Sequence, residues 1–255
     1  MTFCLSSIVR EFASTTPDAP ALTFEDRTLS FRELNDRSSR VANALAGLGV
    51  GRGDRVAILA KNQAEFYELA FGCSKLGAIW VGLNWRLAPP EITAIVADAT
   101  PSVIIVGQEQ EALLSDESRA TTRHVIALGP EYDAWRDGAS AEDAGYVGSP
   151  ADVALLLYTS GTTGLPKGVM LTNEGMSYTR RIGAETWQMS SRSVNLVAMP
   201  MFHIGGIGYG LSTMAQGGHT VLMREVDTRA IIAAIARYGV THSFFVPAVV
   251  QLLLD

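Results

Sequence analysis

The chain is short of cysteine and of concentrated charge, and both shortages narrow what it can be. Only Cys4 and Cys73 occur among its 255 residues, and they form no Cys-x-x-Cys pair. A disulfide framework is therefore not indicated, which favours a reducing compartment such as the cytoplasm. The 20 Lys and Arg residues are outnumbered by 26 Asp and Glu residues, and no basic run occurs. Nucleic acid is consequently not an expected partner.

Long apolar runs are also missing. None reaches the roughly 18 residues that a membrane-spanning helix requires, so we expect no transmembrane segment. The first residues do not read as a signal peptide, because Arg10 and Glu11 interrupt them. The expected location is therefore cytoplasmic, with peripheral association at membranes left open.

Three familiar site patterns are absent. The glycines of residues 49–53 lack the spacing of a dinucleotide fingerprint, and no strand precedes them. Ser160 is not a nucleophile of the Gly-x-Ser-x-Gly type, because Tyr158 occupies the place of the first glycine. The four histidines are dispersed, and no cluster of His, Cys, Asp or Glu has the spacing of a zinc site. Cys73 lies on an apolar stripe, so we expect it in the core.

The chain does contain an alternation of short β-prone runs and amphipathic helices, and 47% of it is hydrophobic. Ser30 followed by Glu33 has the form of a capping box, which predicts a helix that ends before Gly49. Further helices are predicted at residues 63–76, from 89, after 203, at 227–238 and from 247. Strands are predicted at residues 55–60, 79–83, 103–106, 124–128, 153–158, 169–171, 194–198, 219–223 and 240–246. This alternation predicts an α/β fold with a largely parallel sheet covered by helices.

One stretch interrupts the alternation. Between residues 115 and 152 the periodicity weakens, apart from residues 124–128, and acidic residues accumulate. We expect a solvated surface connection there. Farther along, Asn173 is expected to cap a helix.

Residues 158–168 read Tyr-Thr-Ser-Gly-Thr-Thr-Gly-Leu-Pro-Lys-Gly and follow an apolar run that predicts a strand buried on both faces. Three glycines permit φ > 0 and bring N–H groups close to an anion, while four hydroxyls and one lysine add donors. This is not the common P-loop, because Pro166 precedes Lys167 and Gly168 follows it. We predict a polyphosphate cradle; the alternative is a solvated hairpin without a ligand. The predicted cradle residues are Thr159, Ser160, Gly161, Thr162, Thr163, Gly164 and Lys167.

This segment resembles the phosphate loop of the adenylate-forming, AMP-binding superfamily, which includes acyl-CoA synthetases, adenylation domains of peptide synthetases and beetle luciferases. A second specific match is the run Met-Pro-Met-Phe-His-Ile-Gly-Gly at residues 199–206. Supporting matches lie at residues 30–58, 74–87 and 241–254. The resemblance therefore runs over nearly the whole chain.

The resemblance implies layered, mostly parallel sheets with covering helices. One subdomain would span about residues 51–190, and residues 1–50 would join residues 191–255 in a second, with ATP bound at their junction. Family members are longer than this chain. Residues 1–255 are therefore expected to be a partial AMP-binding N-terminal domain without the C-terminal lid domain, and a complementary C-terminal half or a second copy of the chain is an expected partner.

His203 follows a predicted strand, and a single histidine is commonly a surface or core residue. The resemblance instead implies a place beside the acyl carboxylate and the α-phosphate, where its N–H can orient the carboxylate. Gly205 and Gly206 would then leave an open wall for the acyl chain. The alternative is that these two glycines allow close helix packing.

The same segment separates branches of the superfamily. Peptide-synthetase adenylation domains generally carry an aspartate where this chain has His203, and imidazole cannot hold a substrate's ammonium group. Thr162 and residues 84–87 also resemble acyl- or aryl-CoA synthetases. The resemblance therefore implies an acyl-CoA synthetase of the fatty-acid–CoA ligase type.

Such an acid–thiol ligase uses ATP, Mg²⁺ and coenzyme A to activate a carboxylic acid. The implied catalytic residues are Lys167 and His203, and Thr159 is the implied Mg²⁺ ligand. His203, Gly205 and Gly206 would bind the acid. The alternative is a non-catalytic nucleotide- or acyl-binding fragment, or a truncated remnant.

Overall fold

The computed structural model describes residues 3–159 and 166–254. Its contacts divide the chain into two compact units drawn from alternating stretches of sequence. The first unit is Met1–Ser6, Asp36–Ala60 and Tyr67–Met176, and the second is Ser7–Asn35, Lys61–Phe66 and Ser177–Asp255. The predicted subdomain boundaries near residues 51 and 190 stay a prediction.

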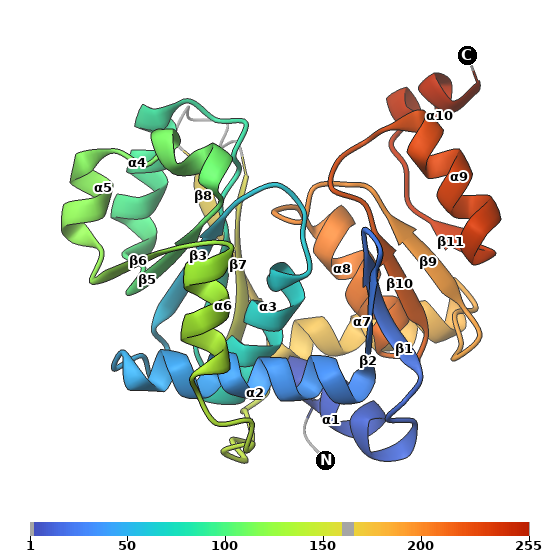
Figure 1. Cartoon of the computed structure of the whole chain (residues 1–255), viewed down its shortest axis with the longest axis horizontal. Helices are drawn as coiled ribbons and strands as arrows, with labels where there is room; N and C mark the ends of the chain where they lie inside the picture. The colour runs from blue at the N-terminus through green and yellow to red at the C-terminus, as the bar shows by residue number, and fades with distance from the viewer. Residues whose placement is uncertain (1–2, 160–165, 255) are drawn as a thin grey trace. The chain divides into compact units, whose positions relative to one another are not determined.

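The first unit is built on a six-stranded sheet with the order β6-β5-β3-β4-β7-β8 (Figure 1). Its strands are β3 (Arg55–Leu59), β4 (Ile79–Gly82), β5 (Val103–Val106), β6 (His124–Ala127), β7 (Val153–Thr159) and β8 (Lys167–Thr172). Neighbours from β6 to β7 run parallel, and β8 pairs antiparallel with β7. The mostly parallel sheet predicted from the sequence is confirmed.

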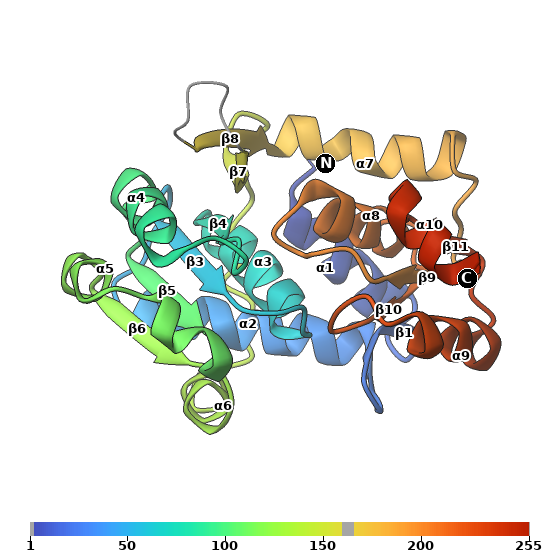
Figure 2. The same cartoon turned by 90° about the horizontal axis from the view of Figure 1, so that it is seen from above.

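Helices cover both faces of this sheet, as short buried parallel strands require. On one side lie α4 (Pro89–Ala99) and α5 (Asp116–Thr121) (Figure 2). A short 3₁₀ helix, η1 (Gln108–Leu113), lies between β5 and α5 in the sequence. On the other lie α3 (Glu65–Leu76), α6 (Pro130–Asp137) and the second half of α2 (Phe31–Gly47). The apolar side of α4 packs on β3, β4 and β5 through Ile92, Ile95, Val96 and Ala99. Cys73 is fully buried, as predicted, and burial raises the pKa of its thiol.

The expectation of a solvated connection between residues 115 and 152 is wrong. The stretch contains α5 and α6, and α6 buries Tyr132 and Arg136. The Arg136 guanidinium pairs with the buried carboxylate of Glu68 on α3 at 3.1 Å, and Arg37 on α2 reaches the same carboxylate at 2.5 Å. The acidic residues of α6 are exposed, but they occupy the outer side of a helix whose inner side is held by this buried ion-pair cluster.

The second unit is built on a five-stranded sheet with the order β11-β9-β10-β1-β2. Its strands are β1 (Pro20–Phe24), β2 (Arg27–Ser30), β9 (Val194–Val197), β10 (His219–Leu222) and β11 (His242–Ser243). β1, β10, β9 and β11 pair parallel, and β2 closes a hairpin with β1. The hairpin was not predicted, and β11 is much shorter than the strand predicted at residues 240–246.

Opposite faces of this sheet receive different helices because successive side chains of a strand point to opposite sides. Leu196 of β9 packs on Ile231 of α9 (Thr228–Tyr238), whereas the neighbouring Asn195 donates from Nδ2 to the Tyr209 carbonyl of α8 (Ile204–Met214) at 3.2 Å. Figure 2 shows α8 and α9 on the two sides of the strands. The remaining helices are α1 (Leu5–Thr15), α7 (Asn173–Glu185) and α10 (Pro247–Leu254).

The caps of two helices test the local predictions. The capping box is confirmed: the Glu33 N–H donates to Ser30 Oγ at 3.2 Å, and the Ser30 N–H donates to Glu33 Oε2 at 2.8 Å. The prediction for α7 is wrong, because Thr172 rather than Asn173 accepts the hydrogen bond from the Gly175 N–H, at 3.1 Å. The Asn173 amide instead donates to the Ser149 carbonyl at 3.0 Å.

Candidate functional site

The predicted phosphate loop joins two strands that are paired with each other. Thr159 ends β7, Lys167 begins β8, and the two residues are direct partners in the antiparallel register. Both are exposed. The sheet therefore fixes both ends of the connecting segment and presents a hydroxyl and an ammonium group beside it. The other predicted cradle residues, Ser160, Gly161, Thr162, Thr163 and Gly164, lie outside the described residues.

The strand that leads into this connection is open on one side. Leu155 and Leu157 are buried, but Leu156 and Tyr158 are only half-buried, so the prediction of burial on both faces is wrong. Gly168 also differs from the expectation of φ > 0, since it lies in β8 and is not among the glycines with positive φ. An added Cβ would lie 2.9 Å from Leu156 Cδ1, so this glycine serves close packing across the hairpin.

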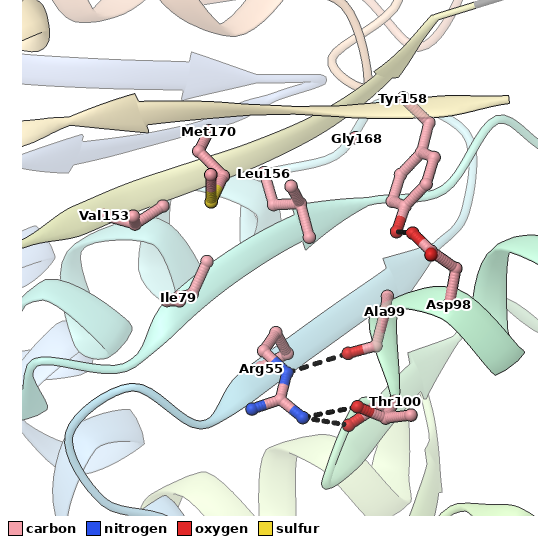
Figure 3. A pocket seen from close by; sticks show the side chains of 10 residues that line it. All are labelled: Arg55, Ile79, Asp98, Ala99, Thr100, Val153, Leu156, Tyr158, Gly168 and Met170. Atoms are coloured by element: carbon pink, nitrogen blue, oxygen red, sulfur yellow. Dashed lines mark hydrogen bonds between the residues drawn. The ribbon is translucent and has the colours of Figure 1, made fainter.

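A pocket of about 310 Å³ lies at this open side, between the β7–β8 hairpin and the end of α4 (Figure 3). The Tyr158 hydroxyl donates to Asp98 at its rim. Burial, together with the neighbouring carboxylate, raises the pKa of Tyr158, which keeps the phenol protonated as a donor. Arg55 is committed to the last carbonyls of α4, at Ala99 and Thr100. The polar groups at the rim are therefore paired with one another.

His203 occupies the start of α8. Its backbone is extended, with φ of -114° and ψ of 150°, and its carbonyl accepts from the Gly206 and Ile207 N–H groups at 2.9 and 3.1 Å. The ring is exposed and lies 4.7 Å from the buried Phe202 ring, centroid to centroid. The imidazole is thus held at a strand-to-helix corner with one side toward solvent.

The two glycines that follow have different surroundings. A Cβ on Gly206 would lie 2.2 Å from the Pro200 carbonyl oxygen, so α8 can meet the preceding loop only through a glycine. This supports the close-packing alternative for Gly206. A Cβ on Gly205 would instead meet the edge of the Phe244 ring at 2.8 Å, and that ring is 42% exposed. Gly205 therefore faces a side chain that can move.

One residue of this corner was missed by the sequence analysis. Asn62, between β3 and α3, is 3% exposed and bonds the backbone at Met199, Met201 and Met223. An asparagine after a strand suggests a local turn. No local pattern could reveal partners that lie 137 to 161 positions away.

The predicted site residues thus form two groups. Thr159 and Lys167 are brought together in the first unit, and His203, Gly205 and Gly206 are brought together in the second. Within the described ranges, no set of three or more His, Cys, Asp or Glu side chains could hold a metal ion. The described helices do not include one with the length and hydrophobicity of a membrane span.

Comparison with known proteins gives one family match and many relatives. The family model described as AMP-binding enzyme matches residues 9–255. A fatty acid–[acyl-carrier-protein] ligase, ScoC, of Streptomyces coeruleorubidus is 34% identical over 93% of this chain and 47% of its own length. A feruloyl-CoA synthase of an Amycolatopsis species is 36% identical over 94% of this chain and 48% of its own length. The chain thus spans about half the length of these relatives.

The fold has a close counterpart among solved structures. The inhibitor-bound N-terminal domain of FACL13 from Mycobacterium tuberculosis superimposes with a TM-score of 0.92 and 27% identity. The match covers 99% of this chain and 65% of that one.

Proposed function

Because the chain belongs to the AMP-binding enzyme family, we propose that it supplies the phosphate loop and part of the acyl site of an ATP-dependent acid–thiol ligase. The observation that carries this proposal is the direct pairing of Thr159 with Lys167 at the two ends of the hydroxyl- and glycine-rich connection. Two side chains suited to phosphate are anchored on adjacent strands, so their separation does not depend on the connection itself.

The proposed reaction has two steps. A carboxylate oxygen attacks the α-phosphorus of ATP, the bond to the β-phosphate oxygen breaks, and pyrophosphate leaves. A thiol then loses its proton, its sulfur attacks the acyl carbon of the acyl-adenylate, and the bond to AMP breaks. Both steps depend on positioning and on the neutralisation of charge.

Lys167 and the loop amides would hold the β- and γ-phosphates. A lysine ammonium 4 Å from a phosphate oxygen contributes about 4 kcal/mol at an effective dielectric constant of about 20. The same contact stabilises pyrophosphate as a leaving group. His203 would donate an N–H to the carboxylate and align it with the α-phosphorus.

Thr159 is suited to bind Mg²⁺, because this ion requires few ligands from the protein. This ion commonly keeps several waters and binds phosphate oxygens with one or two protein ligands. The exposed Thr159 hydroxyl could be one such ligand. The bound ion would neutralise phosphate charge.

The proposed acid is a fatty acid and the proposed thiol is coenzyme A. The relatives' names support acyl and aryl acids alike, since one is a fatty acid ligase and another a feruloyl-CoA synthase. The name of ScoC also favours a second acceptor, the thiol of an acyl-carrier protein. A thioester assay with fatty acids and ferulate, and with both thiols, distinguishes these outcomes.

Lys167→Ala tests whether Lys167 binds the phosphates of ATP. The substitution is made in the full-length protein, by which we mean this chain together with the expected C-terminal half. We expect ATP–pyrophosphate exchange to fall by about two orders of magnitude while the melting temperature stays unchanged, because Lys167 is exposed. Arg229→Ala removes an exposed positive charge from α9 and serves as the control. Exchange that survives Lys167→Ala in a folded protein would rule out the assignment.

The non-catalytic alternative is tested with the 255-residue chain by itself. It spans about half of its curated relatives, and we expect weak ATP binding without detectable thioester formation. If the full-length protein also lacks exchange with every acid, the binding-fragment alternative replaces the proposed ligase.

A further inference from the structure

The side chain of Asn62 hydrogen-bonds three backbone groups near His203. Two of them belong to the residues just before His203, and the third belongs to the end of the neighbouring strand β10. Its Nδ2 donates to the Met199 carbonyl and to the Met223 carbonyl, both at 3.0 Å, and its Oδ1 accepts from the Met201 N–H at 2.8 Å. The residue is 3% exposed. One carboxamide therefore uses both donor hydrogens and its acceptor to hold main chain.

These contacts lie where the chain leaves the sheet toward His203. Met199 and Met201 follow β9, and Met223 follows the adjacent strand β10. The sheet ladder continues to Met223, whose N–H donates to the Val197 carbonyl at 2.9 Å. Asn62 thus holds the backbone of residues 199–201, which lie beyond the end of strand β9, in a fixed position relative to the two strands.

A second constraint acts on the other end of the same segment. The His203 N–H donates to the Pro200 carbonyl at 3.1 Å, and the absence of a Cβ at Gly206 lets α8 pack directly on that carbonyl. Between the two constraints, Met201 and Phe202 are buried and His203 is exposed. The backbone is therefore fixed on both sides of the exposed imidazole.

We propose that Asn62 is a positioning residue for His203: it sets the backbone from Met199 to Met201 and so the point from which the imidazole reaches the carboxylate. This inference rests on the proposed ligase function for its catalytic meaning. A substitution far from the reacting atoms that shifts a catalytic group by about 1 Å can lower the rate about a hundredfold. The effect of substituting Asn62 should therefore be measurable.

A purely structural role is the competing explanation, because any buried asparagine leaves unsatisfied groups behind when it is removed. The two roles differ in what they couple to. If the role is structural, substituting Asn62 lowers the stability of the protein, and the effect does not depend on His203. If Asn62 positions His203, substituting Asn62 lowers the adenylation rate of the folded enzyme, and it does so only when His203 is present.

The test uses Asn62→Ala and the milder Asn62→Ser in the full-length protein, alone and combined with His203→Ala. Asn43→Ala is the matched control, since Asn43 Nδ2 also donates to two backbone carbonyls, those of Ser140 and Glu142, both at 2.8 Å. Three quantities are measured: the adenylation rate, the KM values for acid and ATP, and hydrogen exchange of the amides at residues 201–207.

We expect Asn62→Ala to slow adenylation by about ten- to a hundredfold and to raise the KM for the acid, with the KM for ATP changed less than about twofold. Asn62→Ser should lie between it and the wild type. In the His203→Ala background the further loss should be less than about twofold, because residues that act as a unit are not additive. Exchange at residues 201–207 should accelerate in Asn62→Ala and not in Asn43→Ala.

Three results would overturn the proposal. Unaltered exchange at residues 201–207 would show that Asn62 does not hold the segment, whatever the enzyme's activity. An equal loss of rate with and without His203 would show that the effect does not pass through the imidazole. A folded Asn62 variant with wild-type adenylation kinetics would leave the residue a structural one. A protein without adenylation in any variant contradicts the proposed function instead, and the exchange data still decide whether Asn62 positions the segment.

Discussion

Two buried tyrosines of the first unit differ in the hydrogen bonding of their hydroxyl groups. Tyr67 on α3 and Tyr132 on α6 are both fully buried. The Tyr132 hydroxyl donates to Glu68 Oε2 at 3.2 Å, whereas the Tyr67 hydroxyl has no hydrogen-bond partner among the described residues. Burial also raises the pKa of Tyr67, so its phenol stays neutral.

We expect the two phenylalanine variants to diverge in stability. Tyr132→Phe removes a hydrogen bond to a charged group and should lower the free energy of unfolding by about 1.5–3 kcal/mol. Tyr67→Phe removes a buried hydroxyl without a partner and should be neutral or stabilising by up to about 1 kcal/mol. Thermal melting of both variants beside the wild type decides the matter. Equal losses would mean that the Tyr67 hydroxyl is satisfied in solution.

At the residue scale, the sequence indicates candidates for the chemistry, whose roles stay predictions, but it does not indicate the residues that hold them in place. Lys167 and His203 could be singled out because each stands in a distinctive run of residues. Asn62, Glu68 and Arg136 could not, because their partners come from remote parts of the chain and their types are common on surfaces. What positions a functional side chain is encoded in the fold rather than in its neighbours along the sequence.

At the scale of the elements, strand β10 carries a histidine, His219, whose protonation is linked to the stability of the fold. His219 Nε2 lies 2.7 Å from Thr23 Oγ1 on the parallel neighbour β1, and Thr23 Oγ1 lies 2.7 Å from Thr28 Oγ1 on β2. Burial lowers the pKa of His219 below its ordinary value of about 6.5. The unfolded chain therefore binds a proton at a higher pH than the folded chain does.

This linkage predicts acid sensitivity with a defined sign. The stabilising contribution of neutral His219 is fully present above about pH 6.5 and declines as the pH falls below that value. His219→Gln, which can keep a hydrogen bond to Thr23, should show a smaller drop in melting temperature between pH 7.5 and pH 5.5 than the wild type. A His219→Gln profile that parallels the wild type would contradict the linkage.

The same scale explains which elements the sequence revealed. Strands β3, β4 and β5 were predicted within a residue or two because short, mostly apolar runs buried on both faces leave little ambiguity. Helix α6 was missed because its eight residues include four acids or bases, and the ion pairs that bury Arg136 are not visible as a pattern. The β1–β2 hairpin was missed because its turn contains no glycine; Glu25 itself adopts φ of 53°. Short elements stabilised by remote contacts are those that local patterns do not reveal.

At the scale of the whole chain, apolar side chains gather on part of the second unit. The exposed members on α9, in the connection between β11 and α10, and on α10 are Ile232, Ile235, Phe244, Val246, Val250, Leu252 and Leu254. Leu252 and Leu254 are 56% and 78% exposed. Contiguous exposed apolar surface commonly marks an interface.

We expect the 255-residue chain by itself to self-associate through this surface. Light scattering should give a mass that rises with concentration, and the double substitution Leu252→Glu and Leu254→Glu should return it to the monomer value of 27.3 kDa. Val147→Glu in the first unit, where Val147 is 67% exposed, is the control and should leave association unchanged. A chain that stays monomeric at high concentration would contradict the expectation.

The path of the chain between its two units has a consequence for how such a protein can be rearranged. The backbone passes from one unit to the other five times, and four of these passages fall inside helices α1, α2, α3 and α7. No single cut in the gene separates the units, and a recombination junction placed at any one passage would interrupt a helix or leave each unit without part of its core. The two units must therefore be inherited, exchanged and duplicated together.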